Sequence, residues 1–351
     1  MATSTRPGPL PSSPPVTTAE PEPSARATPG SRAGRLRRLG RLPLAALAVL
    51  GAVLTGLRAV PRLQELPGAG LVASFAAYGL IVWGVVAVLA VVVVRGRARA
   101  TATVAALALA GVHAGWIVPY YIADHQAPGG TPLTILSVNV LGGAADPDAL
   151  TRAAEGADVV VLLEYDATMD AALADRGWAH LFPHRVGDPA DWAIGSVIYS
   201  RRPLREIEQL GTRFGTYLVE VDPGRPDAVG LLAGHPVNPP IGRIAWVREA
   251  RMMGDAARSY AGPRLVVIGD LNSTPDHVTI RRMRAEAGLR DAAQEAGAGW
   301  LRTYPANRAL IPPLLGLDQA LLRGRISAES VETVRVPGTD HLGIRVGLVV
   351  R

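Results

Sequence analysis

The chain has no cysteine, which excludes disulfide bonds, thiolate nucleophiles and zinc sites built from thiolates. It also has no lysine, because all 36 of its basic residues are arginine. Acidic residues are nearly absent from residues 42–122, where Glu65 is the only one among long apolar runs, although the whole chain has 30. Such a stretch is not typical of a soluble domain, so the chain divides into a membrane part and a soluble part.

Positive charge is concentrated in the N-terminal part of the chain. Twelve arginines and four acidic residues precede His125, a net charge of +8, whereas 24 arginines and 26 acidic residues follow, a net charge of −2. A nucleic-acid-binding protein carries its positive charge on the binding domain, because neutralised phosphates supply the affinity. The pI of about 10.1 therefore reflects membrane topology and argues against nucleic acid as the partner.

Three apolar runs predict three membrane-spanning helices, which form an anchor over residues 42–123. The first, residues 42–57, is close to the lower limit of about 17 residues for a spanning helix, so a cleaved signal peptide is the alternative. The second, residues 70–94, carries no charge, and the third, residues 100–122, ends in aromatic residues typical of the membrane interface. His113 lies inside the third run, where we expect a hydrogen bond between helices.

The arginines outside the apolar runs predict the topology. Residues 1–41 form an arginine-rich tail, which we expect to be disordered because its first 31 residues are rich in Pro, Ser, Thr and Ala. By the positive-inside rule this tail and the arginines within residues 95–99 are cytoplasmic, and the chain after a linker at residues 124–132 is extracellular. The sequence thus predicts a multi-pass cell-membrane protein whose partner is the lipid bilayer, with no obligatory protein partner inferred.

Residues 133–351 alternate between short apolar strands and helical stretches, which predicts an α/β domain with sheets inside and helices outside. Strands are expected at residues 134–140, 158–164, 196–200, 216–221, 230–233, 265–268 and 343–350, and helices at residues 147–155, 244–260 and 277–287. Polar residues stand at the ends of several strands, where a rigid sheet can hold them at the rim of a cleft. They are Asn139, Glu164, His235, Asn238, Asp270, Asn272, Asp318, Asp340 and His341.

These side chains are the types that hydrolysis of a phosphate ester requires. The reaction needs a hard cation to neutralise charge, a base for the attacking water and donors for the phosphoryl oxygens. Carboxylates suit Mg²⁺, a histidine beside an aspartate can act as a base, and asparagine donates without adding negative charge. Taken singly, each residue has an ordinary structural explanation as a cap, a turn residue or a loop histidine. Their occurrence together and in this order favours a catalytic site.

Seven stretches carry a resemblance to a known superfamily: SVNV (137–140), LLEY (162–165), GSVIYSRRPL (195–204), GHPVNPP (234–240), VVIGDLNSTP (266–275), LDQALL (317–322) and GTDHLGIRV (338–346). The set resembles the endonuclease/exonuclease/phosphatase superfamily, the DNase I-like fold shared with abasic-site endonucleases, inositol-polyphosphate phosphatases and neutral sphingomyelinases. GDLN with the late DH pair is its most specific part. The resemblance implies a four-layer α/β sandwich, two β-sheets flanked by helices, after the three transmembrane helices.

The resemblance also implies which residues bind the metal and the phosphate. Glu164 corresponds to the principal metal ligand, with Asn139 near the metal and the phosphate and Asp340 beside the metal. His235 and Asn238 would contact the phosphate. The implied cofactor is Mg²⁺, or Mn²⁺ in its place.

The remaining residues are implied in handling the water and its proton. Asp270 and Asn272 would orient the attacking water and the phosphoryl group, and His341 would pair with Asp318. Accounts of the family differ on whether Asp270 or His341 takes the proton of the water, and we favour His341. Gln319 departs from the pattern, since many relatives have His or Tyr at this position, but the preceding aspartate carries the role.

The predicted location of the site indicates the substrate class. It is predicted to face outward, close to the third spanning helix, on a domain that is not basic, which favours a lipid-linked phosphate or diphosphate such as undecaprenyl diphosphate. The arrangement also resembles actinobacterial teicoplanin-resistance membrane proteins of the VanJ type, which implies a cell-envelope phosphatase and an effect on glycopeptide sensitivity. Two alternatives remain: a membrane-tethered nuclease or phospholipase-type phosphodiesterase, and a binding module without catalysis.

The distribution of arginine generates a prediction about topology. A reporter enzyme that is active only outside the cytoplasm should be active when it is fused after residue 130, and silent when it is fused after Arg99, because the two points lie on opposite sides of the third span. The measurement is reporter activity in intact cells at equal fusion-protein levels. The opposite pattern would overturn the extracellular placement of the soluble domain.

Overall fold

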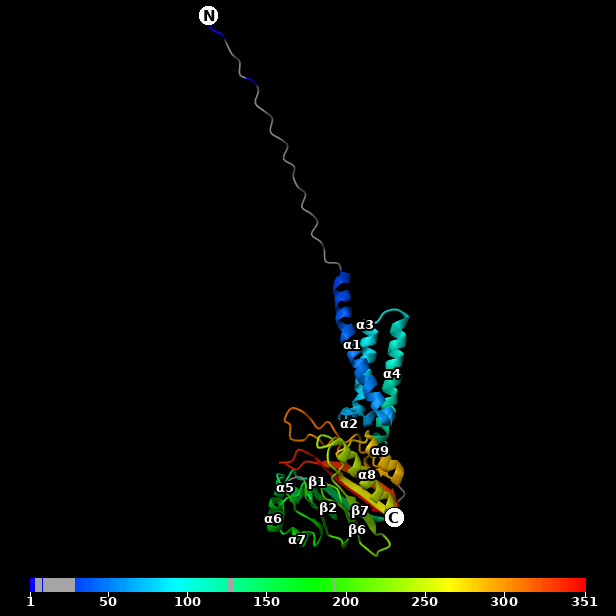
Figure 1. The fold of residues 1–351 in the computed structure, drawn as a ribbon, viewed down its shortest axis with the longest axis vertical. Helices are drawn as coiled ribbons and strands as arrows, with labels where there is room; N and C mark the ends of the chain where they lie inside the picture. The colour runs from blue at the N-terminus through cyan, green and yellow to red at the C-terminus, as the bar shows by residue number, and fades with distance from the viewer. Residues whose placement is uncertain (4–7, 9–28, 125–128, 192–193) are drawn as a thin grey trace.

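The computed structural model describes residues 1–3, 8, 29–124, 129–191 and 194–351. Much of the predicted tail and part of the predicted linker lie outside these residues. Three long helices, α1 (Pro29–Ala59), α3 (Gly79–Val93) and α4 (Arg97–Ile117), stand together on one side of a folded α/β domain (Figure 1). The chain therefore consists of a helical anchor and a domain that follows it.

Three segments of the anchor are long and apolar enough to cross a membrane: Leu39–Ala59, Ala76–Val93 and Arg97–Tyr121. At about 1.5 Å of rise per residue, the shortest segment is about 27 Å long, which is close to the thickness of a hydrocarbon core. The first segment is longer than the apolar run that predicted it. Helix α1 begins at Pro29, so residues 29–41, expected to belong to the disordered tail, are helical.

The second span differs from the single run predicted at residues 70–94. This stretch is divided into α2 (Ala69–Ala73), the 3₁₀ helix η2 (Ala76–Tyr78) and α3. The break occurs where the chain contacts the soluble domain: the carbonyl oxygen of Gly70 lies 2.8 Å from His277 Nε2, and the Tyr78 hydroxyl donates to the Leu314 carbonyl at 2.9 Å. Apolar content alone does not distinguish a segment that faces lipid from one that packs on protein.

The three long helices pack around one tryptophan. Trp83 of α3 is buried in the anchor together with Val86 and Ala106, and its Nε1 donates to Thr55 Oγ1 of α1 at 2.9 Å. His113 Nε2 of α4 lies 2.9 Å from the same hydroxyl, which confirms the hydrogen bond between helices expected for this histidine. The anchor is thus one packed unit and not three independent segments.

The soluble domain contains two six-stranded sheets. The first has the order β11-β12-β1-β2-β4-β3 and the second the order β5-β6-β7-β8-β10-β9. The strands of the first sheet are β1 (Thr131–Asn139), β2 (Val159–Leu163), β3 (His184–Asp188), β4 (Ser196–Ser200), β11 (Ile326–Val334) and β12 (Gly343–Val350). Those of the second are β5 (Leu204–Leu210), β6 (Thr216–Val221), β7 (Val229–Ala233), β8 (Arg264–Asp270), β9 (Arg290–Asp291) and β10 (Asp318–Gly324).

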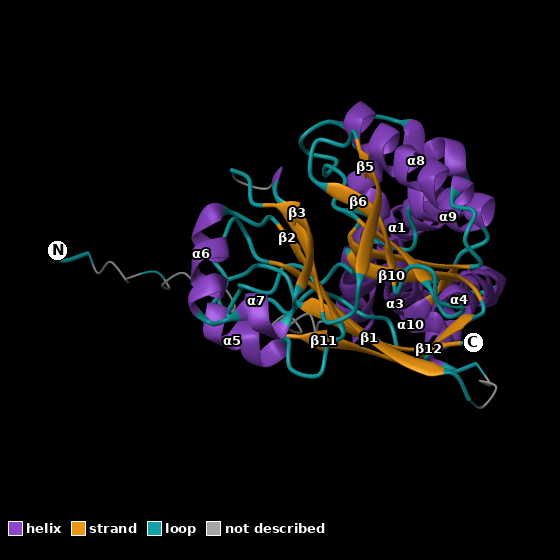
Figure 2. Ribbon diagram, turned by 90° about the horizontal axis from the view of Figure 1, so that it is seen from below, coloured by secondary structure: helices purple, strands orange, loops and turns teal. Residues whose placement is uncertain are grey.

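Helices cover the outer faces of both sheets (Figure 2). On the first sheet they are α5 (Pro147–Ala153), α6 (Ala167–Asp175) and α7 (Trp178–Leu181), and on the second α8 (Arg243–Ser259) and α9 (Val278–Ala287). The short helix α10 (Ala292–Glu295) lies beside β10 and β11. The 3₁₀ helix η1 (Pro61–Glu65) connects α1 to α2, and η3 (Val118–Tyr121) follows α4 and lies beside α10. The result is the predicted four-layer sandwich.

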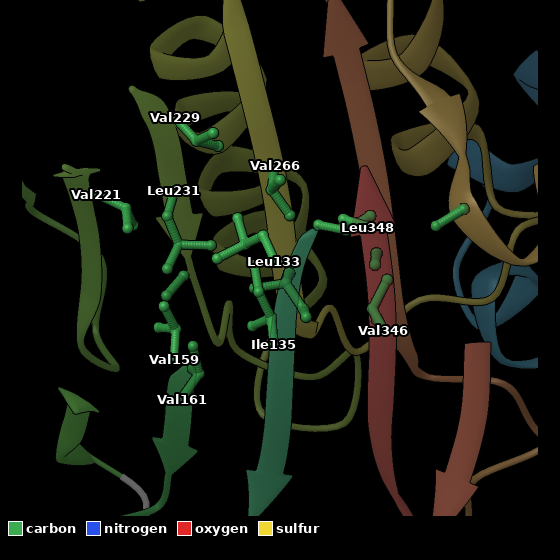
Figure 3. Close-up of a cluster of buried hydrophobic side chains, with 14 of the residues drawn as sticks. Leu133, Ile135, Val159, Val161, Val221, Val229, Leu231, Val266, Val346 and Leu348 are labelled. Carbon is green, nitrogen blue, oxygen red and sulfur yellow. The ribbon is translucent and has the colours of Figure 1, made fainter. Parts of the chain in front are cut away.

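Alternation along the strands explains why the sheets stack. In β1, Leu133 and Ile135 point into the core between the sheets, whereas Leu136 and Val138 point toward the helices. Because successive side chains of a strand point to opposite faces, a strand buried on both sides needs apolar residues at nearly every position. Figure 3 shows the core between the sheets, which such strands fill from both sides.

The sequence pattern predicts interior strands better than edge strands. The strands expected at residues 196–200, 216–221 and 343–350 occur with those bounds. The strands that the pattern did not indicate include all four edge strands: β3, β5, β9 and β11. Edge strands are partly solvated and carry charged residues, as in LREIEQL of β5, so they lack the apolar signal of an interior strand.

A buried glutamate on α8 fixes two loops of the second sheet. Glu249 is fully buried, and its two carboxylate oxygens accept hydrogen bonds from the backbone N–H groups of Arg213 and Val237, at 3.1 and 3.0 Å. A buried backbone donor that loses its acceptor costs about 1–3 kcal/mol. The side chain therefore stabilises the loops that carry Phe214 and His235.

Replacement of this glutamate should destabilise the protein. We expect Glu249→Ala to lower the free energy of unfolding by about 2–5 kcal/mol, because two backbone donors lose their acceptor. The measurement is thermal unfolding of the full chain in detergent, followed by tryptophan fluorescence. Glu329→Ala is the matched control, since Glu329 is exposed on β11, and it should change stability by less than about 0.5 kcal/mol. Equal melting temperatures for the two variants would contradict this assignment.

Candidate active site

The ends of five strands bring the predicted residues to one edge of the sandwich. In the parallel pair β1–β2, β1 ends at Asn139 and β2 ends just before Glu164. In the parallel pair β7–β8, β8 ends at Asp270. Asp318 begins β10 and pairs in register with Asp270. His341 comes just before β12, which is antiparallel to β1. The topology thus gathers residues that are far apart in the sequence.

A cavity of about 240 Å³ opens at this edge. Seven of the nine predicted polar residues line it: Glu164, His235, Asn238, Asp270, Asn272, Asp340 and His341. Asn139 and Asp318 are buried and bonded to residues of this group. A larger groove of about 740 Å³ between α8 and α9 contains none of the nine, so we identify the site by its chemistry and not by its volume.

His341 lies between two buried aspartates. Its Nδ1 is 2.8 Å from Asp318 Oδ2, and its Nε2 is 3.5 Å from Asp270 Oδ2. Burial alone would lower the pKa of the imidazole, but the neighbouring carboxylates raise the pKa of His341 to about 10. At neutral pH the side chain is therefore an imidazolium that donates to Asp318.

The two aspartates shift in opposite directions. Burial raises the pKa of Asp318 above its ordinary value, and the charge of His341 offsets only part of that effect. Burial acts on Asp270 in the same sense, but the charges of His341 and His235 hold the pKa of Asp270 below its ordinary value. Asp270 thus has the lower pKa of the two aspartates, and it lines the cavity.

Asn139 connects the carboxylates. Its Nδ2 donates to Glu164 Oε1 at 2.9 Å and to Asp270 Oδ2 at 3.3 Å, and its Oδ1 accepts from the backbone N–H of Leu141 at 3.0 Å. The side chain therefore holds two negative groups close together. Its contact with a metal or a phosphate stays a prediction, because its amide groups are engaged with protein atoms here.

His235 approaches the same carboxylates from the second sheet. Its Nε2 is 3.5 Å from Asp270 Oδ2 and 3.8 Å from Glu164 Oε1. The ring lies against Phe214, with the ring centres 4.8 Å apart, and Nδ1 has no hydrogen-bond partner within the described part of the chain. The histidine is therefore positioned beside the carboxylates, where a phosphate would also be within reach.

The two remaining asparagines bind the loops around the cavity. Asn272 Nδ2 donates to the carbonyl of Pro236 at 2.9 Å, and its backbone N–H donates to Asp270 Oδ1 at 3.0 Å. Asn238 Oδ1 accepts from the backbone N–H of Ile241 at 3.1 Å. Both side chains line the cavity, and their contact with substrate stays a prediction.

Two of the site residues have a left-handed backbone conformation. Glu164 has φ of 54° and Asn272 has φ of 46°, which is uncommon for residues other than glycine. Such a conformation costs about 1 kcal/mol or more and persists where the surrounding structure imposes it, often at functional sites. At Glu164 it turns the chain directly after β2, at the rim of the cavity.

The site contains more carboxylates than cations, which suits a divalent metal ion. Glu164 and Asp340 line the cavity, and Asp340 Oδ1 is buried without a hydrogen-bond partner among the described residues. A buried carboxylate oxygen is costly unless a donor or a cation meets it. Carboxylate oxygens are also the ligands that Mg²⁺ and Mn²⁺ prefer, so these two residues fit the predicted metal.

A second set of groups is closer together but fits a metal less well. Asp270, Asp318 and His341 each offer one ligand atom, and these atoms all lie within 4.8 Å of one another. His341 Nδ1 is already bonded to Asp318 Oδ2, so this nitrogen is not available to a metal ion. We therefore interpret this set as an ion-paired cluster.

Several residues of the site were not among those predicted from the sequence. Tyr304 lines the cavity with its ring centre 4.9 Å from that of His341, and Thr339 Oγ1 donates to the carbonyl of Asn139 at 2.7 Å. Leu71 and Ser74 of the anchor also line the cavity. An apolar run predicts a membrane span, but it does not show which of its residues line the catalytic cavity.

Comparisons with known proteins agree with this geometry. Residues 136–341, more than half of the chain, match the Endonuclease/Exonuclease/phosphatase family. The fold is similar to that of D. rerio TDP2 complexed with single strand DNA product, with a TM-score of 0.50 and 16% identity, covering 62% of this chain and 99% of that one. Bacteroides thetaiotaomicron VPI-5482 mannosyl-6-phosphatase Bt3783 has a TM-score of 0.44 and 15% identity, covering 62% and 99%.

No curated protein matches the chain as a relative. The likeness to D. rerio TDP2, at 16% identity, shows a shared fold, whereas the family match rests on the sequence of the soluble domain itself. That match covers the strand ends at which the polar residues gather. The chain belongs to the endonuclease/exonuclease/phosphatase family.

Proposed function

We propose that the chain is a membrane-bound, metal-dependent phosphoesterase with an extracytoplasmic active site, acting on a lipid-linked phosphate or diphosphate such as undecaprenyl diphosphate. One observation carries the lipid part of this proposal. The cavity that contains the catalytic candidates is lined in part by Leu71 of α2, a helix of the anchor, and by Ser74, which follows that helix. A site in contact with the anchor is accessible to a phosphate at the membrane surface.

The described side chains support attack of water on phosphorus. The oxygen of water bonds to phosphorus, the bond from phosphorus to the leaving oxygen breaks, and the water gives up a proton. Glu164 and Asp340 would hold the divalent cation, Mg²⁺ or Mn²⁺, which supplies charge neutralisation at the phosphoryl oxygens when it is bound. The imidazolium of His341 would place positive charge and a donor beside the same oxygens, and His235 Nε2 lies 3.5 Å from Asp270 Oδ2.

The proton of the water goes to Asp270 in this proposal, and not to His341 as the sequence favoured. His341 is held as an imidazolium by its two aspartate neighbours, and a protonated imidazole donates hydrogen bonds but does not accept a proton. Asp270 is ionised, because the neighbouring histidines hold its pKa below the ordinary value. Asp318 then acts as the group that orients His341.

The charge of the domain favours a lipid phosphate over nucleic acid. From His125 onward the chain has a net charge of −2, and a nucleic-acid groove depends on clustered positive charge. A membrane-tethered nuclease or phospholipase-type diesterase has the same machinery and is the alternative. The resemblance to teicoplanin-resistance proteins adds a cellular consequence: loss of the protein should raise sensitivity to that antibiotic.

Metal dependence tests the first part of the mechanism. Hydrolysis of undecaprenyl diphosphate by the full chain in vesicles should stop in EDTA and return with Mg²⁺ or Mn²⁺, because the carboxylates need a cation to neutralise the substrate. Glu164→Gln should lower kcat by about 10² or more, whereas the exposed Glu329→Gln should retain wild-type activity. Phosphate release is the measurement, with DNA and a phospholipid as parallel substrates. Full activity in EDTA would falsify the mechanism, and cleavage of DNA alone would favour the nuclease.

The roles of Asp270 and His341 are separated by the pH dependence of kcat. Asp270→Asn should lower kcat by about 10² or more, because it removes the proton acceptor and keeps the shape. If His341 acts as an imidazolium, kcat falls as pH rises through its pKa, and His341→Gln abolishes that fall. A kcat that instead rises through the same pKa would identify His341 as the base. Circular dichroism of each variant checks that the fold is retained.

A further inference from the structure

The segment that joins the first two spans is docked on the soluble domain. Arg58 Nε donates to Asp276 Oδ1 at 2.6 Å. Gln64 is almost fully buried; its Nε2 donates to the carbonyl of Asp276 at 3.1 Å, and its Oε1 accepts from the backbone N–H of Val278 at 2.8 Å. These contacts hold η1 against the start of α9, so the segment has a defined place beside the domain.

His277 connects α2 to the loop that carries the catalytic candidates. Its Nδ1 accepts from the backbone N–H of Thr274 at 2.7 Å, so Nε2 carries the proton and donates to the carbonyl of Gly70 at 2.8 Å. Thr274 comes two residues after Asn272. The buried ring of Trp246 lies close to Gly70 and donates from Nε1 to Ser273 Oγ at 2.9 Å. Helix α2 is therefore bound to the same loop as Asp270.

This docking brings an apolar side chain of the anchor to the catalytic cavity. Leu71 and Ser74 line one side, and Ile241 and the prolines before it line another. Leu71 and Ile241 remain nearly half exposed, at 47% and 46%. An apolar residue that is exposed at the rim of a polar cavity offers a surface for an apolar part of the ligand.

Other exposed apolar residues lie in the sequence near those that line the cavity. Phe75, Ile244, Leu310 and Ile311 are exposed large apolar residues in the segments that flank the cavity-lining ones. In Figure 1 the loop drawn in orange, which follows α10, lies beside α2 on the side of the domain where the helices stand. Carboxylates and exposed apolar side chains in one cavity match a phosphate head group with a hydrocarbon chain.

We propose that α2 is the substrate-selecting wall of the site, and that Leu71 contacts the hydrocarbon chain of a lipid phosphate whose head group reaches the carboxylates. This inference rests on the proposed phosphatase function and goes beyond it, because it assigns chain-length selectivity to a residue of the anchor. A plain tether would only raise the local concentration of the domain at the membrane. A wall instead changes which substrate the site prefers.

Leu71→Asn in the full chain tests the proposal, with Val72→Asn as the matched control. Val72 lies on the same short helix and is exposed to a similar extent, at 40%, but does not line the cavity. The protein is placed in phosphatidylglycerol vesicles, and kcat/KM is measured for undecaprenyl diphosphate in the bilayer and for isopentenyl diphosphate in solution. The two probes share a diphosphate and differ in chain length.

We expect Leu71→Asn to lower the ratio of kcat/KM for the long chain over the short chain by about tenfold or more, and Val72→Asn to leave the ratio within about twofold of wild type. Equal ratios for the two variants would overturn this inference and leave the phosphatase proposal intact. If Leu71→Asn lowers kcat/KM equally for both substrates, the inference is also overturned and the phosphatase proposal stays intact, because such a loss indicates general damage to the site. If the wild type hydrolyses neither diphosphate, the proposed function fails, and this inference fails with it.

Discussion

Buried negative charge at the ends of the strands is the constraint on which the rest of the structure depends. Asp270 and Asp318 face each other across adjacent strands, and Glu164 is linked to Asp270 through Asn139. Removing carboxylates from water costs several kcal/mol per ion unless other groups compensate the charge. The imidazolium of His341 and the amide of Asn139 supply part of that compensation. A divalent cation, on which enzymes of this family depend, supplies a further part when it is bound.

The sandwich provides the rigidity that such compensation needs. Glu164 and Asp270 stand at the ends of the buried interior strands β2 and β8, so that the distance between them is set by the packing of the strands. The left-handed conformation of Glu164 shows that the site also imposes strain on its own backbone. Buried Glu249 extends this support to the loop of His235, since its carboxylate holds the backbone next to that loop.

The anchor contributes to the same arrangement from the outside. Its α2 helix is hydrogen-bonded to His277, and His277 is hydrogen-bonded to the loop that begins at Asp270. Membrane attachment and catalytic geometry are therefore connected through a short path of packed and hydrogen-bonded groups. Members of one fold family act on many substrates, and an element added beside the site, such as α2 here, can determine which substrate is preferred.

The sequence by itself determined the division into an apolar anchor and an α/β domain, the interior strands, and the identity of the polar residues at strand ends. These features are local, because apolar periodicity and chain order are visible in one segment at a time. Only the tertiary structure decided that α2 leaves the second span to meet the cavity, that Tyr304 lies beside His341, and that edge strands as polar as β5 complete the sheets. It also decided that the pKa of His341 is raised, since a pKa depends on which carboxylates are adjacent in space. Each of these facts depends on contacts between residues far apart in the chain, and no pattern within a single segment records them.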